Sequence, residues 1–440
     1  LDQCSLLTDL YQLTMSACYL GEGVAQRPAS FELFTRRLPE NYGYLIAMGL
    51  TQALDYLTQL HFSPEQIAAL QQTGMFAQAP AEFWTMLTEF QFTGDVWAVP
   101  EGTPIFANEP LLRVDAPLWQ GQVVETYLLN TLNYQTLIAT RAARLRDVVG
   151  NGVTLLEFGT RRAFSPQASL WAARAALAGG LDATSNVLAA LQLGRQPSGT
   201  MAHALVMALA ALEGSETQAF TAFQRYFPQA PLLIDTYDPI AAAAQLATQR
   251  QAGLDIGGVR LDSGDLVTLS QAVRSRLPGV PIVASGDLDE FEIQRLQRAG
   301  ACLDGYGLGT KLVTGSPVNG VYKLVEIDGQ PVMKASSGKM TYPGRKQVFR
   351  QVNAQGEIQG DRLGLMSDAP QADEQPQLHC VMRAGQQLAP PDALDAIATR
   401  TRTAVQQLPP SIRQIAQPEP FPVAISATLN ALTQTCLLYT

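Results

Sequence analysis

The chain has 440 residues, of which 47% are hydrophobic, so it can bury a sizeable core and is long enough for two or three domains. Its formal net charge of −9 argues against general nucleic-acid binding, and its five cysteines, which form no C-x-x-C pair, argue against a zinc site or a disulfide framework. No apolar run reaches the roughly 18 residues of a membrane helix, and no basic segment followed by an apolar one opens the chain, so we expect a cytoplasmic protein without a membrane span.

The first part of the chain mixes helices with short strands. Apolar residues recur at helical spacing over residues 5–19, which predicts an amphipathic helix. Residues 30–37 alternate like a strand that ends beside Arg36, and residues 94–115 contain short apolar runs broken by Pro and Gly. We therefore predict an N-terminal α+β domain over residues 1–121.

A different pattern, in which strands alternate with helices, follows a long helix that is expected to begin at residue 122. The strands are expected over residues 153–158, 188–193, 232–235, 256–261, 281–284 and 305–308, with helices near 166–178, 201–212, 239–251, 266–276 and 289–299. Repeated βα units imply parallel strands, so residues 122–315 are predicted to form a complete or partial (β/α) barrel. Residues 316–440 open with a hairpin that turns at Asp328-Gly329, become polar, Pro-rich and finally helical, and are expected to pack back on the N-terminal domain.

Acids, bases and glycines cluster where the predicted strands end, which is where parallel strands place their ligands. The densest cluster is residues 257–265, where Arg260 and Asp262 stand among three glycines. Similar clusters occupy residues 157–162, 199–203, 235–238, 285–287 and 305–311. One such acid alone could be a helix cap, but the recurrence of the pattern favours a shared site.

Six motifs, in their order and spacing, resemble the nicotinate phosphoribosyltransferase family of the type II phosphoribosyltransferases. They occupy residues 8–15, 157–163, 180–187, 199–203, 261–265 and 307–310, and the resemblance covers nearly the whole chain. It implies an irregular or partial (β/α) barrel with an α+β domain built from the N-terminal region and the C-terminal tail. It also implies that nicotinate and phosphoribosyl pyrophosphate form nicotinate mononucleotide and pyrophosphate in NAD salvage, with ATP hydrolysis coupled to the reaction.

The residues around the first barrel strand suit a planar anionic base. Phe158 can clamp the ring, and Arg161 can pair with its carboxylate. By resemblance, Tyr11 stacks on the base from a partner subunit, so we expect an obligate head-to-tail homodimer in which Tyr11 and Arg36 complete the partner's site. Ser185 falls where nicotinamide-specific relatives carry an Asp, which predicts nicotinate as the substrate, because a hydroxyl can donate to a carboxylate. The alternative is that Ser185 only caps a helix.

The remaining candidates suit phosphates and a metal ion. Asp235 and Asp262 can hold the ribose hydroxyls and a Mg²⁺ bound to pyrophosphate, near Arg260. His203, one of three histidines, stands in the family's G-T-x-A-H motif, which implies that ATP phosphorylates it. The chain has no Walker loop, so ATP must share the site of phosphoribosyl pyrophosphate. Thr200, Ser285, Gly286, Gly307, Gly309 and Thr310 complete the expected substrate-binding set, and it stays open which of Lys334, Lys339, Arg345 and Lys346 contact phosphates.

Other functions stay open at this point. The chain could be a nicotinamide or quinolinate phosphoribosyltransferase. A barrel lyase or aldolase could use Lys311 or Lys323 as a Schiff base, or the acids could serve a Mg²⁺-dependent enolising enzyme. A non-catalytic protein could bind the same metabolites without turnover.

Overall fold

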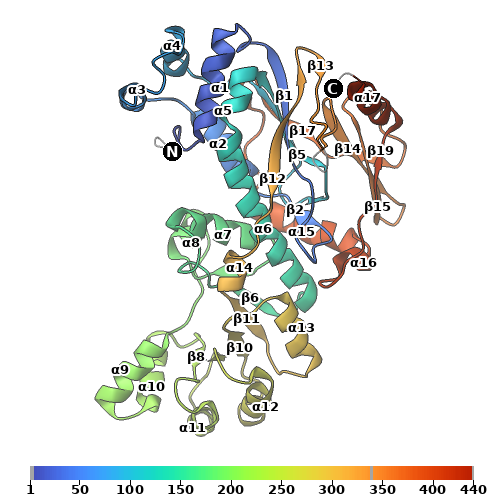
Figure 1. The fold of residues 1–440 in the computed structure, drawn as a ribbon. Helices are drawn as coiled ribbons and strands as arrows, with labels where there is room; N and C mark the ends of the chain where they lie inside the picture. Colours follow the sequence, from blue (N-terminus) through green and yellow to red (C-terminus); the bar gives the residue numbers. More distant parts are fainter. Residues whose placement is uncertain (1–3, 337–339, 439–440) are drawn as a thin grey trace. The chain divides into compact units, whose positions relative to one another are not determined.

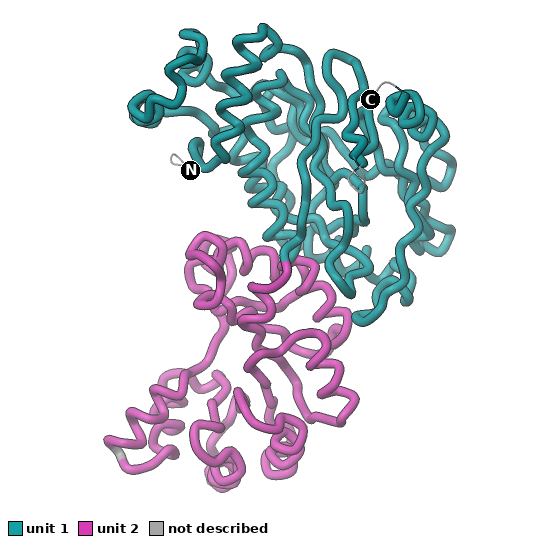
Figure 2. The backbone as a smooth tube through the Cα atoms, viewed as in Figure 1, with its two compact units in different colours: residues 1–137, 317–440 teal, residues 138–316 magenta. Residues whose placement is uncertain are grey.

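The computed structural model describes residues 4–336 and 340–438. The backbone divides into two compact units, a first unit of residues 1–137 and 317–440 and a second unit of residues 138–316 (Figure 2). The division falls inside the long helix α6 (Glu125–Val149), whereas the sequence analysis places a domain boundary just before that helix, at residue 122. In the described ranges, none of the helices combines the length and the hydropathy that a membrane crossing requires.

The first unit is built on a seven-stranded antiparallel sheet that both ends of the chain supply. Its strands, in spatial order, are β13 (Gln330–Pro331), β12 (Gly320–Ile327), β1 (Pro28–Thr35), β5 (Pro110–Pro117), β3 (Asp95–Ala98), β17 (His379–Arg383) and β18 (Gln386–Gln387). β1 pairs with β12 on one side and with β5 on the other, and Figure 1 shows β12 beside β1. The predicted α+β domain, formed from the N-terminal region and the tail, is therefore confirmed.

Helices and short strands complete the first unit. The N-terminal segment supplies α1 (Leu10–Gly21), α2 (Leu50–Gln59), α3 (Pro64–Gln72), α4 (Glu82–Thr88), α5 (Leu118–Val123) and the pair β2 (Leu45–Ile46) and β4 (Pro104–Ile105), and the tail supplies α15 (Leu394–Gln407), α16 (Pro410–Arg413) and α17 (Ala427–Leu437). Asp328 and Gly329 adopt positive φ angles of 52° and 74° between β12 and β13. These angles are those of a tight hairpin turn, as the Asp-Gly pair predicts.

The tail also contains a four-stranded sheet that the sequence analysis does not predict. Its order is β16 (Glu374–Pro376), β14 (Lys346–Val352), β15 (Ile358–Leu365) and β19 (Val423–Ile425). β14 looks polar because Lys346 and Arg350 interrupt it, but both side chains are buried and paired. Lys346 Nζ lies 2.9 Å from Glu32 Oε2, and Arg350 Nη2 lies 2.7 Å from Asp361 Oδ2. Pairing offsets the cost of removing a charge from water, so these ion pairs allow a polar sequence to form an interior strand.

The second unit is built on a six-stranded parallel sheet. Its strands lie in the order β7 (Ala183–Thr184), β6 (Thr154–Glu157), β11 (Gly305–Leu308), β10 (Ile282–Ser285), β9 (Val259–Leu261) and β8 (Leu232–Leu233). Each neighbouring pair is parallel. The sheet is open, with β7 and β8 as its edges, so the predicted (β/α) barrel is a partial one.

Helices connect the strands of the second unit and confirm most of the predicted alternation. They are α7 (Pro166–Ala178), α8 (Val187–Gln192), α9 (His203–Glu213), α10 (Glu216–Tyr226), α11 (Pro239–Gln251), α12 (Leu266–Arg276), α13 (Glu290–Arg298) and α14 (Thr310–Val313). Asp238 accepts from the N–H groups of Ile240 and Ala241 at 2.9 and 3.0 Å, and therefore caps α11.

The strand expected over residues 188–193 is wrong. That segment is helix α8, and the strand of this βα unit is the two-residue β7 just before it. Asn186 explains the difference, because its Oδ1 accepts a hydrogen bond from Ala189 N–H at 3.1 Å and so starts a helix. The apolar side chains of residues 188–193 do not form a buried strand, since Leu188 and Leu191 are more than half exposed.

Candidate active site

A cavity of about 850 Å³ lies at the carboxyl ends of the parallel strands in the second unit. Most of the residues that the sequence singles out line it: Phe158, Arg161, Ser185, Thr200, His203, Arg260, Asp262, Ser285, Gly286, Gly307, Gly309 and Thr310. These residues lie at or near the carboxyl ends of five strands, β6, β7, β9, β10 and β11, as expected for a site in a parallel α/β unit.

The aromatic wall of the cavity depends on a glycine. A Cβ atom on Gly307 would lie 2.5 Å from the ring carbons Cδ2 and Cε2 of Phe158, so the ring packs against a position that only glycine allows. Gly307 lies inside β11, between Ser285 and Leu156 on the neighbouring strands. Its position gives it a steric role, whereas the sequence analysis considers its N–H as a phosphate donor.

Three arginines line the cavity, and two of them, Arg161 and Arg260, influence each other electrostatically. The pKa of Arg260 is lowered, mainly because the side chain is buried. The charges of Asp262 and Asp235 oppose this decrease, and the positive charge of Arg161 adds to it. Arg260 Nε is buried and has no hydrogen-bond partner among the described residues. Because like charges repel unless a counter-ion lies between them, this pair favours an anionic ligand.

The second wall of the cavity contains an acid and a histidine. Asp262 Oδ1 accepts a hydrogen bond from the Ser285 hydroxyl, and its Oδ2 lies 4.0 Å from His203 Nε2. The other ring nitrogen of His203 lies 3.0 Å from Thr236 Oγ1. The side chains of His203 and Asp262 are both 39% exposed, so a ligand in the cavity can reach them.

Asp235 occupies a different place from the one expected. It does not line the cavity; its Oδ2 accepts from Asp262 N–H at 2.7 Å and from the Ser263 hydroxyl at 3.0 Å. Asp235 therefore holds the turn that presents Asp262. Helix α12 is capped by Asp265, which accepts from Val267 N–H at 3.2 Å, so capping does not explain Asp262.

The small residues next to the cavity also have identifiable roles. Gly286 has a φ of 94°, and a Cβ there would lie 2.4 Å from the carbonyl oxygen of Asp262, so both conformation and space require glycine. The Thr200 hydroxyl donates to the carbonyl of Pro231. The N-cap of α8 is Asn186, so the alternative that Ser185 only caps this helix is wrong.

Sequence reasoning missed two charged residues that line the cavity, Arg162 and Asp287. Arg162 follows Arg161 directly, and only one arginine of the pair was assigned to the substrate. Asp287 adopts a positive φ of 35°, which is uncommon for a residue with a side chain. The Ser-Gly-Asp triplet at the end of β10 could have indicated Asp287, because its other two residues, Ser285 and Gly286, were already expected to bind the substrate.

Glu216, a half-buried acid near Asp235, has a raised pKa. Burial, followed by the charges of Asp235 and Asp238, raises the pKa of Glu216 to about 7 from its usual 4.5. Glu216 Oε1 and Asp235 Oδ1 are both buried and have no hydrogen-bond partner among the described residues. Glu216 is therefore protonated in the folded protein over a pH range in which it is ionised in the unfolded chain.

This difference predicts a pH-dependent stability. Because the folded protein binds the extra proton, the free energy of unfolding should fall as the pH rises from about 4.5 to about 7. Glu216→Gln should remove this part of the pH dependence, as measured by urea unfolding at pH 5, 6, 7 and 8. An unchanged slope in the variant would show that other groups cause it.

The first unit carries the other predicted residues, which include Tyr11 and Arg36. Tyr11 is 47% exposed on α1. The pKa of Lys323 is lowered, mainly because the side chain is buried. The negative charge of Glu125 opposes this decrease, and the positive charges of Arg36 and Lys334 add to it. Arg36, Lys323 and Lys334 are thus close enough to form a basic cluster in the first unit.

The structure narrows the set of basic residues that could bind phosphates. Lys346 is buried and paired with Glu32, and Arg345 Nε lies 3.1 Å from Glu326 Oε1. Lys339 lies outside the described residues. Lys334 is exposed, which leaves it as the better phosphate candidate of this segment.

The two lysines considered for a Schiff base differ from a typical amine nucleophile. Lys311 Nζ lies 2.8 Å from Asp289 Oδ2, and this hydrogen bond raises its pKa. Lys323 belongs to the first unit and does not line the cavity. A Schiff-base lysine requires a lowered pKa beside its substrate, so neither residue fits that role in this cavity.

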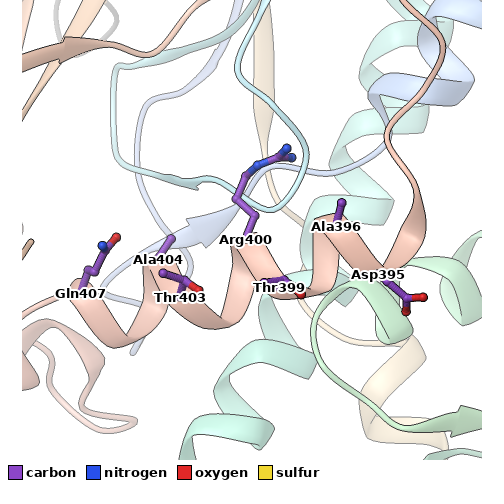
Figure 3. Close-up of a pocket in the computed structure, with 7 residues that line it drawn as sticks. All are labelled: Asp395, Ala396, Thr399, Arg400, Thr403, Ala404 and Gln407. Carbon is purple, nitrogen blue, oxygen red and sulfur yellow. The ribbon is translucent and has the colours of Figure 1, made fainter.

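A second hollow, of about 580 Å³, lies along one face of α15 in the first unit. Figure 3 shows its seven lining side chains, which extend from Asp395 to Gln407 on this one helix. Arg400 donates to Asp392 Oδ2 at 2.7 Å and to the carbonyl of Glu101. Because this guanidinium is committed to the protein, the cavity in the second unit is the candidate active site.

Known proteins resemble this chain over nearly its whole length. Family models for the N-terminal domain, the family itself and the C-terminal domain of nicotinate phosphoribosyltransferase match residues 6–133, 153–282 and 369–433. A nicotinate phosphoribosyltransferase of Mycobacterium tuberculosis strain H37Rv is 40% identical over 437 residues, which cover 96% of this chain and 91% of the relative. One of Bacillus subtilis strain 168 is 42% identical over 389 residues, covering 83% and 77%.

A solved structure agrees with these relatives. The crystal structure of human nicotinic acid phosphoribosyltransferase matches with a TM-score of 0.85 and 30% sequence identity, over 97% of this chain and 99% of that one. The six sequence motifs, the partial parallel barrel and the cavity at its strand ends lead to the same assignment. The chain belongs to the nicotinate phosphoribosyltransferase family.

Proposed function

We propose that the protein joins nicotinate to phosphoribosyl pyrophosphate and releases nicotinate mononucleotide and pyrophosphate, with coupled ATP hydrolysis. The observation that carries this proposal is one cavity that combines the Phe158 ring, the guanidinium groups of Arg161 and Arg260, and the Asp262–His203 pair. A flat anionic base needs the ring and a cation. A ribosyl donor with a charged leaving group needs the other cation and the acid.

The chemistry follows from these positions. The ring nitrogen of nicotinate forms a bond to the anomeric carbon while the bond from that carbon to pyrophosphate breaks. Positive charge develops on the ribosyl centre, where the Asp262 carboxylate can stabilise it, and Arg260 can neutralise the departing pyrophosphate. Arg161 and the Ser185 hydroxyl would hold the nicotinate carboxylate beside the Phe158 ring.

Mg²⁺ fits this site as a partner of pyrophosphate. The described residues include no group of three or more acidic, histidine or cysteine side chains arranged to hold a metal ion alone. Mg²⁺ usually takes one or two carboxylates and completes its shell with water and substrate phosphates. Asp262 and Asp287 are the carboxylates that line the cavity and could hold it, and the ion would supply positive charge to the leaving group.

Assays with three bases test the proposal. Purified protein with phosphoribosyl pyrophosphate should convert nicotinate, but not nicotinamide or quinolinate, and ATP should accelerate the reaction. Conversion of another base at a comparable rate would refute the substrate assignment. Trapping of a keto acid by borohydride would indicate a Schiff-base enzyme instead, and binding without turnover would indicate a metabolite-binding protein.

His203 is proposed to receive the phosphoryl group of ATP. His203→Ala should remove ATP hydrolysis and its stimulation of synthesis, while slow synthesis without ATP remains, because ribosyl transfer itself does not need phosphohistidine. The measurement compares ADP release and nicotinate mononucleotide formation in the same samples. His61→Ala is the control, since His61 is exposed and lies in the first unit; intact ATP coupling in His203→Ala would refute the assignment.

We also propose that the protein is a homodimer whose sites are completed by Tyr11 and Arg36 of the partner, and that it acts in the cytoplasm. Leu7, Leu10 and Tyr11 are exposed together at the start of the chain, by 55%, 47% and 47%, and exposed apolar clusters often mark interfaces. All five cysteines are free, as is usual in a reducing compartment.

Complementation between variants tests the shared site. Tyr11→Ala and Arg161→Ala chains should each have little activity, but a refolded equal mixture should recover up to about a quarter of the wild-type activity, because about half of all dimers are mixed and each mixed dimer carries one intact site of its two. The activity of each variant alone is the baseline. A mixture no more active than its components would refute the shared site.

A further inference from the structure

A buried carboxyl group lies beneath the residues proposed to bind nicotinate. Glu157 is the last residue of β6 and is only 1% exposed. Its Oε1 accepts a hydrogen bond from Gly159 N–H, and its Oε2 accepts one from the Thr184 hydroxyl. Burial raises the pKa of Glu157 and these two hydrogen bonds lower it. Among the described residues it has no ion-pair partner, so the two donors are what stabilise it.

The first donor belongs to the turn that carries Arg161. The N–H groups of Arg162 and Ala163 both donate to the carbonyl of Gly159, at 2.7 and 3.1 Å, and thereby close this turn. A Cβ atom on Gly159 would lie 2.3 Å from Val313 Cγ1, so the turn is packed tightly at its start. The contact with Glu157 Oε1 therefore anchors the segment that presents the guanidinium of Arg161.

The second donor belongs to the segment that carries Ser185. While the Thr184 hydroxyl donates to Glu157, its oxygen accepts from Asn186 N–H at 3.0 Å. Ser185 N–H donates to the backbone carbonyl of Glu157 at 2.9 Å. The residues on both sides of Ser185 are thus tied, directly or through Thr184, to Glu157.

We propose that Glu157 is a positioning residue that fixes the distance between Arg161 and Ser185, and thereby selects a pyridine carboxylate over its amide. The two oxygens of a carboxyl group lie at a fixed separation in one plane, so segments bonded to opposite oxygens cannot shift independently. A carboxylate ligand needs the cation and the hydroxyl at matched distances, and an error of about 1 Å can cost a hundredfold in rate.

Two substitutions disturb the hydrogen bond between the Glu157 carboxyl group and the Thr184 hydroxyl, one at each partner. Glu157→Gln keeps an acceptor for Gly159 but places an NH₂ group against the Thr184 hydroxyl, and Thr184→Val removes that hydroxyl. Each should raise the KM for nicotinate about tenfold or more, as expected for a lost buried hydrogen bond, and lower the preference for nicotinate over nicotinamide. The KM for phosphoribosyl pyrophosphate should change less than about twofold. Thr184→Ser keeps the hydroxyl and should restore the wild-type values.

The chain offers a matched control in the first unit. Glu101 is 4% exposed, and its carboxyl oxygens accept from Gly49 N–H at 2.8 Å and from the Thr51 hydroxyl at 3.0 Å, the same types of donor as at Glu157. Glu101→Gln should lower the Tm to an extent comparable with Glu157→Gln, but should leave the KM for nicotinate and the base preference unchanged.

The outcomes separate this inference from the proposed function on which it rests. A wild-type protein that forms no nicotinate mononucleotide refutes the proposed function, and the inference with it. If the wild type is active but both variants only lose Tm, as Glu101→Gln does, then Glu157 is merely structural and the inference is overturned. If Glu157→Gln does not fold, the comparison of Thr184→Val with Thr184→Ser decides the question.

Discussion

Replacing Asp262 with Asn is expected to lower kcat/KM by roughly a hundredfold to a thousandfold, the range seen when one group that stabilises transition-state charge is removed. One oxygen of Asp262 accepts from the Ser285 hydroxyl and the other lies 4.0 Å from His203 Nε2. The amide has nearly the same size but lacks the charge that would balance the ribosyl cation and hold Mg²⁺. Initial rates with nicotinate and phosphoribosyl pyrophosphate, repeated over a range of Mg²⁺ concentrations, measure the effect.

Asp265 provides the control for this substitution. It lies three residues further along, outside the cavity, and caps α12 through Val267 N–H and the Thr268 hydroxyl. Asp265→Asn should cost at most about 1 kcal/mol of stability, because Asn is also a good N-cap, and should leave kcat/KM nearly unchanged. Equal effects of the two substitutions would show that Asp262 acts only through the local fold.

The residues of the cavity could be predicted from the sequence because parallel strands place their carboxyl ends at one edge of a sheet. Arg161 and Asp262 follow buried strands and Ser285 ends one, so their meeting in one cavity follows from the βα alternation alone. The same reasoning does not show whether a side chain at a strand end faces the cavity or the neighbouring backbone. Asp235 also follows a strand, but its side chain turns toward the backbone of Asp262, and strand order alone does not indicate this.

The parts that could not be predicted depend on partners distant in the sequence. β14 is a strand because Lys346 meets Glu32, more than 300 residues away, and no local pattern encodes that ion pair. Helix α8 is predicted as a strand because a five-residue apolar run, residues 187–191, suits both structures, and the sequence analysis does not recognise the capping role of Asn186. Tyr11 and Arg36 were found only through the family resemblance, since their proposed partner is a second chain.

The preference for an acid over an amide is expected to depend on Ser185. Its backbone N–H is bonded to Glu157, and its side chain lines the cavity with Phe158 and Arg161. In Ser185→Asp a carboxylate would face the carboxylate of nicotinate. A like charge at contact in a partly desolvated site costs on the order of several kcal/mol, so the KM for nicotinate should rise about a hundredfold or more.

Ser185→Asn is the matched variant for this prediction, because it introduces the same volume without the charge. It should impair nicotinate use far less than Ser185→Asp. Neither variant should change the KM for phosphoribosyl pyrophosphate more than a few-fold, because the proposed phosphate contacts, Arg260 and the Ser285 loop, lie at the ends of β9 and β10. If Ser185→Asp and Ser185→Asn impair nicotinate equally, the effect is steric. If neither does, nicotinate selection by this chain depends on Arg161 without Ser185.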